Sequence, residues 1–112
     1  SLSLAHGNSM LIHNVYFWLR KDLSADDRAT FESELRRLET IDYLERGVVG
    51  SPAATEERPV IDHSFDFAAC LIFKSMADHD YYQKECADHT RFISSCKSFW
   101  ERVVIYDVEP LS

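Results

Sequence analysis

Apolar side chains dominate the segment from Phe65 to Lys74, with little polar interruption. Side chains alternate between the two faces of a β-strand. One face of such a strand would carry Phe65, Phe67, Ala69, Leu71 and Phe73, and the other face Ala68, Cys70 and Ile72. A strand with one face in water alternates apolar with polar residues, whereas a strand covered on both faces is apolar throughout. The segment therefore predicts a central strand with packing partners on both sides.

A second strand of the same kind is predicted from Leu11 to Leu19, which is rich in β-branched and aromatic residues. One face would carry Leu11, Val15, Phe17 and Leu19, and the other face Ile12, Tyr16 and Trp18. Weaker apolar runs predict a short edge strand around Val48-Val49 and a last strand from Val103 to Val108. A loop is expected across residues 51–59.

Amphipathic helices are predicted between these strands. Ser24 with Asp27 forms a capping box. Apolar residues then recur every three or four positions, which predicts a helix from about Ala25 to about Tyr43.

A second helical region begins where Ser75 with Asp78 repeats the capping pattern. One stripe of this region gathers residues spaced by three or four positions, namely Tyr82, Cys86, His89, Ile93, Cys96 and Trp100. Because Asp88 is able to cap a new helix, the pattern also allows a break near Cys86.

The order of elements is β-α-β-β-α-β, the ferredoxin-like arrangement of an α+β fold with a four-stranded antiparallel sheet. A right-handed crossover from the first strand to the third would make these two strands central neighbours. The helices cover only one face of the sheet, yet both central strands are apolar on both faces. Because a bare apolar face of this size is unusual on a monomer, we expect an isologous homodimer in which two sheets pack face to face as an α+β barrel.

Composition narrows the class of protein. With 112 residues, of which 46% are hydrophobic, the chain is long enough for one domain with a core, predicted over residues 10–110. The 12 basic and 19 acidic residues give a net charge of −7, which disfavours nucleic acid and anionic membranes as partners. No apolar run reaches the length of a membrane span. Residues 1–9 lack the features of a signal peptide, and we interpret them as a disordered leader or residues added for expression.

Candidate ligands for metals or cofactors are sparse in the sequence. Cys70, Cys86 and Cys96 lie inside apolar patterns without a CxxC spacing, so we interpret them as buried thiols of a reducing compartment, by default the cytoplasm. The five histidines lack the local spacing of metal ligands, and there is no glycine-rich phosphate loop. The sequence therefore predicts neither a metal nor a cofactor.

His89 is the strongest candidate for chemistry that the pattern offers. An imidazole on an apolar helical stripe titrates near neutral pH and is the usual proton-transfer group in enzymes. The alternative is a core histidine bonded to a backbone carbonyl. Tyr82 lies seven residues earlier on the same stripe, roughly 10 Å along a continuous helix, so the two side chains would hold opposite ends of one ligand.

Four segments together resemble the stress-responsive A/B barrel (Dabb) family: residues 12–21, 65–74, 82–89 and 98–107. The resemblance covers nearly everything from Met10 to Pro110. It implies a ferredoxin-like fold and a homodimeric α+β barrel, the architecture that the hydrophobic pattern also predicts.

One branch of that family, the plant polyketide cyclases, is similar to this chain in residues 98–107. That branch uses a His and a Tyr as acid/base groups in an intramolecular aldol closure. The resemblance places the His on His89 and the Tyr near Tyr82 or Gln83. The usual family pattern Tyr-Gln-x-His-Pro-x-His is one residue longer here and lacks the first His and the Pro, and Asn14 stands where the family often has a second histidine on the first strand.

The resemblance also turns one face of the first strand toward the helices, where an amide and a phenol among aromatic rings would suit a pocket. The ligand-binding residues expected on this basis are Asn14, Tyr16, Trp18, Phe31 and Trp100. Alternatively, Tyr16 and Trp18 are simply core residues with satisfied polar atoms. His13 would fall on the opposite face, at the dimer interface, with a structural role.

Two functions of different class are expected. The first is a homodimer that binds a small, largely apolar ligand between sheet and helices or acts in stress protection, without catalysis. The second is a cofactor-independent cyclase or lyase with His89 as general base and Tyr82 or Tyr16 orienting a carbonyl. A pocket in which His89 and a phenol reach one ligand would favour the enzyme, and His89 bonded to backbone in a filled core would favour the first function.

Overall fold

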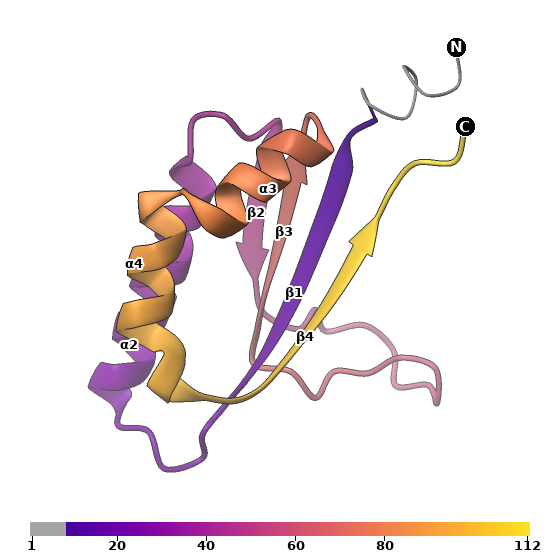
Figure 1. Ribbon diagram of the computed structural model, residues 1–112. Helices are drawn as coiled ribbons and strands as arrows, with labels where there is room; N and C mark the ends of the chain where they lie inside the picture. Colours follow the sequence, from indigo (N-terminus) through magenta and orange to yellow (C-terminus); the bar gives the residue numbers. More distant parts are fainter. Residues whose placement is uncertain (1–8) are drawn as a thin grey trace.

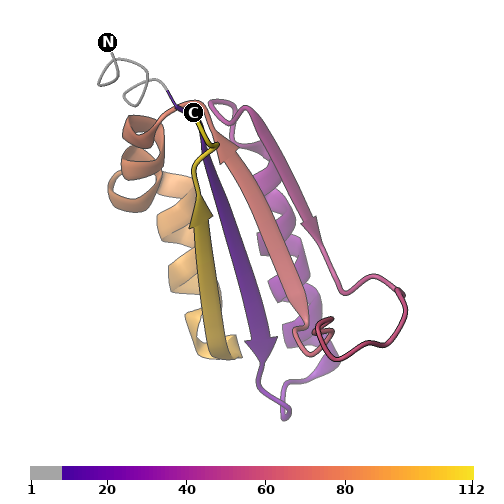
Figure 2. The same ribbon diagram turned by 90° about the vertical axis from the view of Figure 1, so that its right-hand side faces the viewer.

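The computed structural model describes residues 9–112 as one four-stranded sheet with helices on a single face (Figures 1 and 2). In chain order the elements are β1 (Leu11–Leu19), α2 (Ala25–Arg37), the 3₁₀ turn η1 (Leu38–Thr40), β2 (Arg46–Gly50), β3 (Phe67–Phe73), α3 (Met76–Lys84), α4 (Ala87–Cys96), the 3₁₀ turn η2 (Lys97–Phe99) and β4 (Trp100–Val108). The leader predicted over residues 1–9 lies outside the described residues except for Ser9. Within residues 9–112, none of the helices has the length and apolar character needed to cross a membrane.

The sheet has the strand order β2-β3-β1-β4, with every neighbouring pair antiparallel. The ferredoxin-like fold and the central position of β1 and β3 are therefore confirmed. The predicted crossover from the first strand to the third is wrong, because β1 and β3 run in opposite directions. α2 instead leads from β1 to β2, which are parallel, and β3 inserts between them.

Both predicted serine caps begin helices. The Ser24 hydroxyl accepts a hydrogen bond from Asp27 N at 3.0 Å, and Ser75 accepts one from Asp78 N at 3.1 Å. The first helix is shorter than predicted, because Ile41 takes an extended conformation and turns its side chain into the core. The chain then joins the sheet, with Glu45 N donating to Ile72 O at 2.9 Å.

The second helical region divides into α3 and α4 at Glu85 and Cys86, as the sequence allowed. The backbone N–H groups of both residues donate to Tyr81 O, at 2.7 Å and 3.0 Å. This doubled bond closes α3, and Cys86 begins the next helix in an extended conformation without a side-chain cap. The predicted apolar stripe thus lies on two helices that meet at an angle (Figure 1).

The core lies between the helices and one face of the sheet. Along β1 the odd-numbered residues are buried and the even-numbered residues are half-buried, so the odd-numbered face packs under the helices. Phe31 of α2 is fully buried at the centre of an aromatic cluster. Its ring centroid lies 5.2 Å from Phe17 of β1, 5.5 Å from Phe67 of β3 and 5.7 Å from Phe92 of α4. The cluster therefore ties α2 and α4 to both central strands.

The opposite face of the sheet, the open face, has none of the described helices on it (Figure 2), and its side chains are mostly apolar. It carries half-buried side chains from the central strands and exposed ones from the edges, including Tyr106, which is 63% exposed, and Val48 and Val108, each 45% exposed. The loop of residues 51–66 lies at one end of this face (Figure 1). The loop meets the sheet where Trp18 Nε1 donates to Ser64 Oγ at 3.0 Å, so it covers the Trp18 end.

Phe65 lies on this open face, contrary to the prediction that it shares a face with Phe67. Its ring centroid is 5.1 Å from that of Tyr16 and 6.5 Å from that of Trp18. The reason is that β3 begins only at Phe67, so strand alternation does not extend back to Phe65.

We expect Phe31→Ala to lower the free energy of unfolding by about 3–5 kcal/mol, because it removes a fully buried ring and leaves a cavity in the aromatic cluster. Thr30→Ala, at the exposed neighbouring position of α2, should change it by less than about 0.5 kcal/mol. Urea unfolding at one chain concentration measures both variants. A loss below about 1 kcal/mol for Phe31→Ala would contradict the role assigned to the cluster.

Candidate functional site

A cavity of about 270 Å³ lies between the sheet and the helices. Most of its wall is apolar and comes from both central strands, α4 and β4, including Val15, Phe17, Ala69, Leu71, Phe92 and Trp100. The polar groups in the wall are His13, Tyr82, Gln83 and His89. The cavity thus combines an apolar interior with a small set of groups able to donate or accept protons.

His89 and Tyr82 are in contact in this wall, with ring centroids 4.4 Å apart. A continuous helix would separate residues seven positions apart by roughly 10 Å along its axis. The break at Glu85 and Cys86 removes that separation, because Tyr82 lies near the end of α3 and His89 in the first turn of α4. The expectation that the two side chains hold opposite ends of a ligand is therefore wrong, and both face the same part of the cavity.

Burial sets the protonation of both groups. Desolvation lowers the pKa of His89, and the nearby imidazoles of His13 and His79 lower it further. Desolvation also raises the pKa of the Tyr82 hydroxyl, with a smaller contribution from Cys86. At neutral pH the pair is thus an uncharged imidazole beside an uncharged phenol, an arrangement able to accept a proton at one group and donate a hydrogen bond from the other.

His13 lies under the helices, contrary to the expectation that it faces a dimer interface. Its side chain is 2% exposed, and its Nδ1 lies 2.6 Å from Asp107 Oδ1 on β4. Burial lowers the pKa of His13 more than the Asp107 carboxylate raises it. The face was misassigned because the family resemblance turned the even-numbered face of the strand toward the helices. The helices instead cover the odd-numbered face, which His13 shares with Leu11 and Val15.

Asn14, Tyr16 and Trp18 lie on the open face, so the expectation that they face the helices is wrong. The Asn14 amide donates to Tyr106 O at 3.1 Å, and the guanidinium of Arg102 lies 4.3 Å from the Trp18 ring centroid. Tyr16 and Trp18 line a different hollow, of about 390 Å³, beside the loop. A role for these three residues in ligand binding stays a prediction, separate from the cavity that holds His89.

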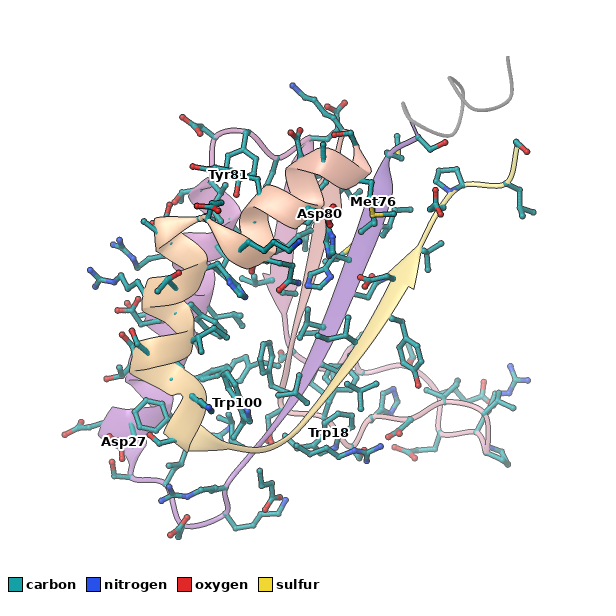
Figure 3. The ribbon with its side chains drawn as sticks, in the orientation of Figure 1. Trp18, Asp27, Met76, Asp80, Tyr81 and Trp100 are labelled. Atoms are coloured by element: carbon teal, nitrogen blue, oxygen red, sulfur yellow. The ribbon has the colours of Figure 1, made fainter. Side chains whose placement is uncertain are left out.

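Of the other two residues expected in the cavity, Trp100 and Phe31, only Trp100 lies in its wall. Phe31 is buried behind that wall in the aromatic cluster, 6.4 Å from Trp100 between ring centroids. Figure 3 shows Trp100 and Trp18 on opposite sides of the sheet. The structure thus brings Trp100 together with Tyr82 and His89 and leaves the open-face residues apart.

A group of three potential metal ligands also meets at this end of the molecule. His13 of β1, His79 of α3 and Asp107 of β4 each place one ligating atom within 4.8 Å of the others. Local spacing did not reveal the group, because its members come from three elements far apart in the sequence. One signal was present: His79 precedes Tyr82 by three residues and therefore shares its inward face of the helix.

Comparisons with known proteins agree on the architecture. Residues 11–110 match the profile of the stress responsive A/B barrel domain family, Dabb. Among curated proteins, no sequence is similar enough to match. A Dabb family protein from Mesorhizobium loti has a similar structure, with a TM-score of 0.72 and 20% identity over 93% of this chain and 99% of the other.

Two further solved structures are similar over most of their length. A dimeric ferredoxin-like protein from Thermobifida fusca has a TM-score of 0.72 and 15% identity over 92% of each chain. The hydroxynitrile lyase from Passiflora edulis has a TM-score of 0.72 and 18% identity over 93% of this chain and 95% of the other. At sequence identities of 15–20%, the structural similarity establishes that these proteins share the fold.

Acid should destabilise the protein through its buried imidazoles. Because folding lowers the pKa of His89, the unfolded chain takes up a proton more readily than the folded chain as the pH falls through the unfolded value of 6.5. The free energy of unfolding should therefore decrease as the pH falls from 7 to 5. The decrease ends once the pH is below the lowered pKa of the folded state. His89→Gln should make this decrease smaller, with His13 supplying the remainder.

Urea unfolding at pH 7, 6 and 5 measures this pH dependence. The matched control is Thr30→Ala, at an exposed position of α2 without a titratable side chain, which should leave the wild-type slope in place. A wild-type slope retained in His89→Gln would contradict the burial of a neutral imidazole at that position.

Proposed function

Because this chain belongs to the stress-responsive A/B barrel domain family, we propose that it binds a small, largely apolar molecule in the cavity between the sheet and the helices. The observation that carries this proposal is the cavity wall, which is apolar except where Tyr82, Gln83, His89 and His13 gather. Sites for small molecules usually combine apolar walls with a few orienting polar groups. A volume of about 270 Å³ lies just below the usual range for drug-sized ligands, which favours a compact molecule.

The entrance that we propose lies along α4. A surface hollow of about 370 Å³ shares Gln83, His89 and Ile93 with the cavity wall. Ile105 of β4, which is 48% exposed, belongs to the cavity wall as well. A ligand entering between these side chains would pass His89 and place its apolar part against Phe17 and Trp100.

The contact between His89 and Tyr82 favours a second function, proton transfer to and from the bound ligand. Within residues 9–112, no protein hydrogen bond ties the His89 ring, so its nitrogens are available to a ligand. Burial keeps the imidazole neutral and the phenol protonated near pH 7. The hydroxynitrile lyase of Passiflora edulis shares this fold, which supports a lyase role for the scaffold.

The step that this geometry supports is a carbonyl condensation within one ligand. A ring nitrogen of His89 takes a proton from the carbon beside a carbonyl. The C–H electron pair forms the C=C bond of an enolate, and the π pair of the C=O bond moves onto the oxygen, which accepts a hydrogen bond from the Tyr82 hydroxyl. The enolate carbon then forms a bond to a second carbonyl carbon of the ligand. The oxygen of that carbonyl takes the proton back from His89, so the step is balanced.

Exchange of the methyl protons of acetophenone in D₂O, followed by proton NMR, tests the first half of this step. We expect the wild-type protein to accelerate exchange, His89→Gln to lose at least about a hundredfold of the acceleration and Tyr82→Phe to lose less, since general bases contribute about 10²–10⁴-fold. His63→Gln, in the loop, should match wild type. Equal rates for wild type and His89→Gln would exclude the base.

A thermal-shift titration with the same ketone separates binding from proton transfer. Acetophenone should raise the melting temperature of wild type and of His89→Gln, and Ile93→Trp, which places a larger side chain at the entrance, should lose the shift. Absence of any shift in wild type would contradict the cavity as a site for aromatic ketones.

We also propose that two copies associate through the open face of the sheet. That face is mostly apolar, with Asn14 as a polar exception on β1, and carries Tyr106 and Val108 at its edge. The loop reaches only its Trp18 end, so most of the face has no cover within the chain. Dimeric proteins from Thermobifida fusca and Bacteroides fragilis share the fold, which supports an isologous pair.

Light scattering should therefore report two chains per particle at micromolar concentration. Tyr106→Asp should shift the particle toward the monomer, because it places a charge in the apolar face. Tyr81→Asp is the matched control, since Tyr81 is 51% exposed on α3, away from the sheet, and should leave the dimer unchanged (Figure 3). A wild-type monomer would remove the face-to-face arrangement.

The proposed location is the cytoplasm. All three cysteines are free thiols, with Cys86 and Cys96 buried and Cys70 half-buried. A reducing compartment suits a chain that holds its thiols unpaired.

A further inference from the structure

The geometry points to a divalent metal site at the end of the sheet beside α3, with His13, His79 and Asp107 as its protein ligands. The ion that we propose is Zn²⁺ or a similar borderline transition metal. The site shares His13 with the cavity wall but does not use His89, and it goes beyond the proposed function.

The three ligands converge from three different elements. His13 is on β1, Asp107 is paired with it on β4, and His79 lies in α3, which crosses this end of β1. The ring centroids of His13 and His79 are 5.2 Å apart, and one ligating atom of each of the three residues lies within 4.8 Å of the others. In Figure 3 the labelled Asp80 marks the turn of α3 that carries His79.

One nitrogen of this group is buried without a protein partner. Within the described residues, His79 Nε2 is inaccessible to solvent and makes no hydrogen bond, while Nδ1 of the same ring lies 3.3 Å from Asp80 Oδ1. A buried nitrogen without a partner carries a desolvation cost. An ion bound at Nε2 would remove that cost, and the carboxylate on Nδ1 would orient the ring as outer-shell carboxylates do at metal sites.

The distances in the group are compatible with coordination after small movements. Two ligands of a tetrahedral Zn²⁺ lie roughly 3.3 Å apart, given bonds of about 2.0–2.1 Å. The 2.6 Å contact between His13 Nδ1 and Asp107 Oδ1 is shorter than this, and the 4.8 Å limit of the group is longer. The Asp107 side chain is 43% exposed and free to withdraw slightly, and rotation of His79 would bring its nitrogen closer.

The chemistry of the donors selects the class of ion. Two imidazoles and one carboxylate suit Zn²⁺ and its neighbours, whereas Mg²⁺ and Ca²⁺ prefer sites made of oxygen atoms. Three protein ligands would leave a fourth position open for water or a ligand. The exposed Asp107 provides the route by which the ion enters from solvent, and His13, at 2% exposure, forms the buried floor.

Calorimetric titration of the full chain with Zn²⁺, after treatment with EDTA and dialysis, tests this proposal. We expect one ion per chain in wild type. His79→Gln and Asp107→Asn should each raise the dissociation constant at least tenfold. Asp107 is exposed and His79 is half-buried, and both variants keep a polar side chain at the position, so we expect them to fold. His63→Gln, which removes a loop histidine bonded to Thr55, is the matched control and should bind as wild type does.

Two further readouts locate the ion. Co²⁺ should give visible absorption bands of a four-coordinate site with nitrogen and oxygen ligands in wild type and in His63→Gln, and lose them in His79→Gln. His89→Gln should keep the bands, which separates failure of this site from failure of the proton-transfer proposal. Substoichiometric binding of Zn²⁺ to wild type, or equal dissociation constants in His79→Gln, Asp107→Asn and His63→Gln, would overturn the site.

Discussion

A four-stranded sheet has two faces, and the helices of this chain pack on only one of them (Figure 2). This constraint divides the molecule into a covered face and an uncovered face. The covered face holds the core around Phe31 and the cavity beside Trp100. The uncovered face keeps an apolar surface that the loop meets only near Trp18, and burying that surface would be favourable in proportion to its area. The same chain thus has an inner site and an outer surface whose roles differ.

The interruption between α3 and α4 gives the cavity its chemistry. An unbroken helix would hold Tyr82 and His89 two turns apart, roughly 10 Å along its axis. The shared acceptor Tyr81 O closes α3 instead, and the chain restarts at Cys86 in a new direction. The imidazole and the phenol then touch within an apolar wall, where burial holds both groups in their neutral forms.

The strand β1 connects this cavity with the second polar group of the molecule. Its odd-numbered residues supply Val15 and Phe17 to the cavity and His13 to the cluster with His79 and Asp107. Both sites therefore include side chains of a central strand that has neighbours on both sides. This placement favours precise positioning, because side chains on rigid elements vary less than side chains on loops.

The local sequence pattern determined several elements of the fold, namely both serine caps, the two apolar strands and the break near Cys86. Each of these depends on residues only a few positions apart. The participation of His89 in the cavity wall was also readable, from helical spacing. The side of β1 that the helices cover could not be predicted from the sequence. Both faces of this strand carry bulky apolar residues, so the hydrophobic pattern fits either face equally well. Only packing against Phe31 and its neighbours chose the odd-numbered face, and that choice buried His13 and left Tyr16 outside. The metal-ligand cluster likewise exists only in the tertiary structure, since its members meet across elements with no shared local period.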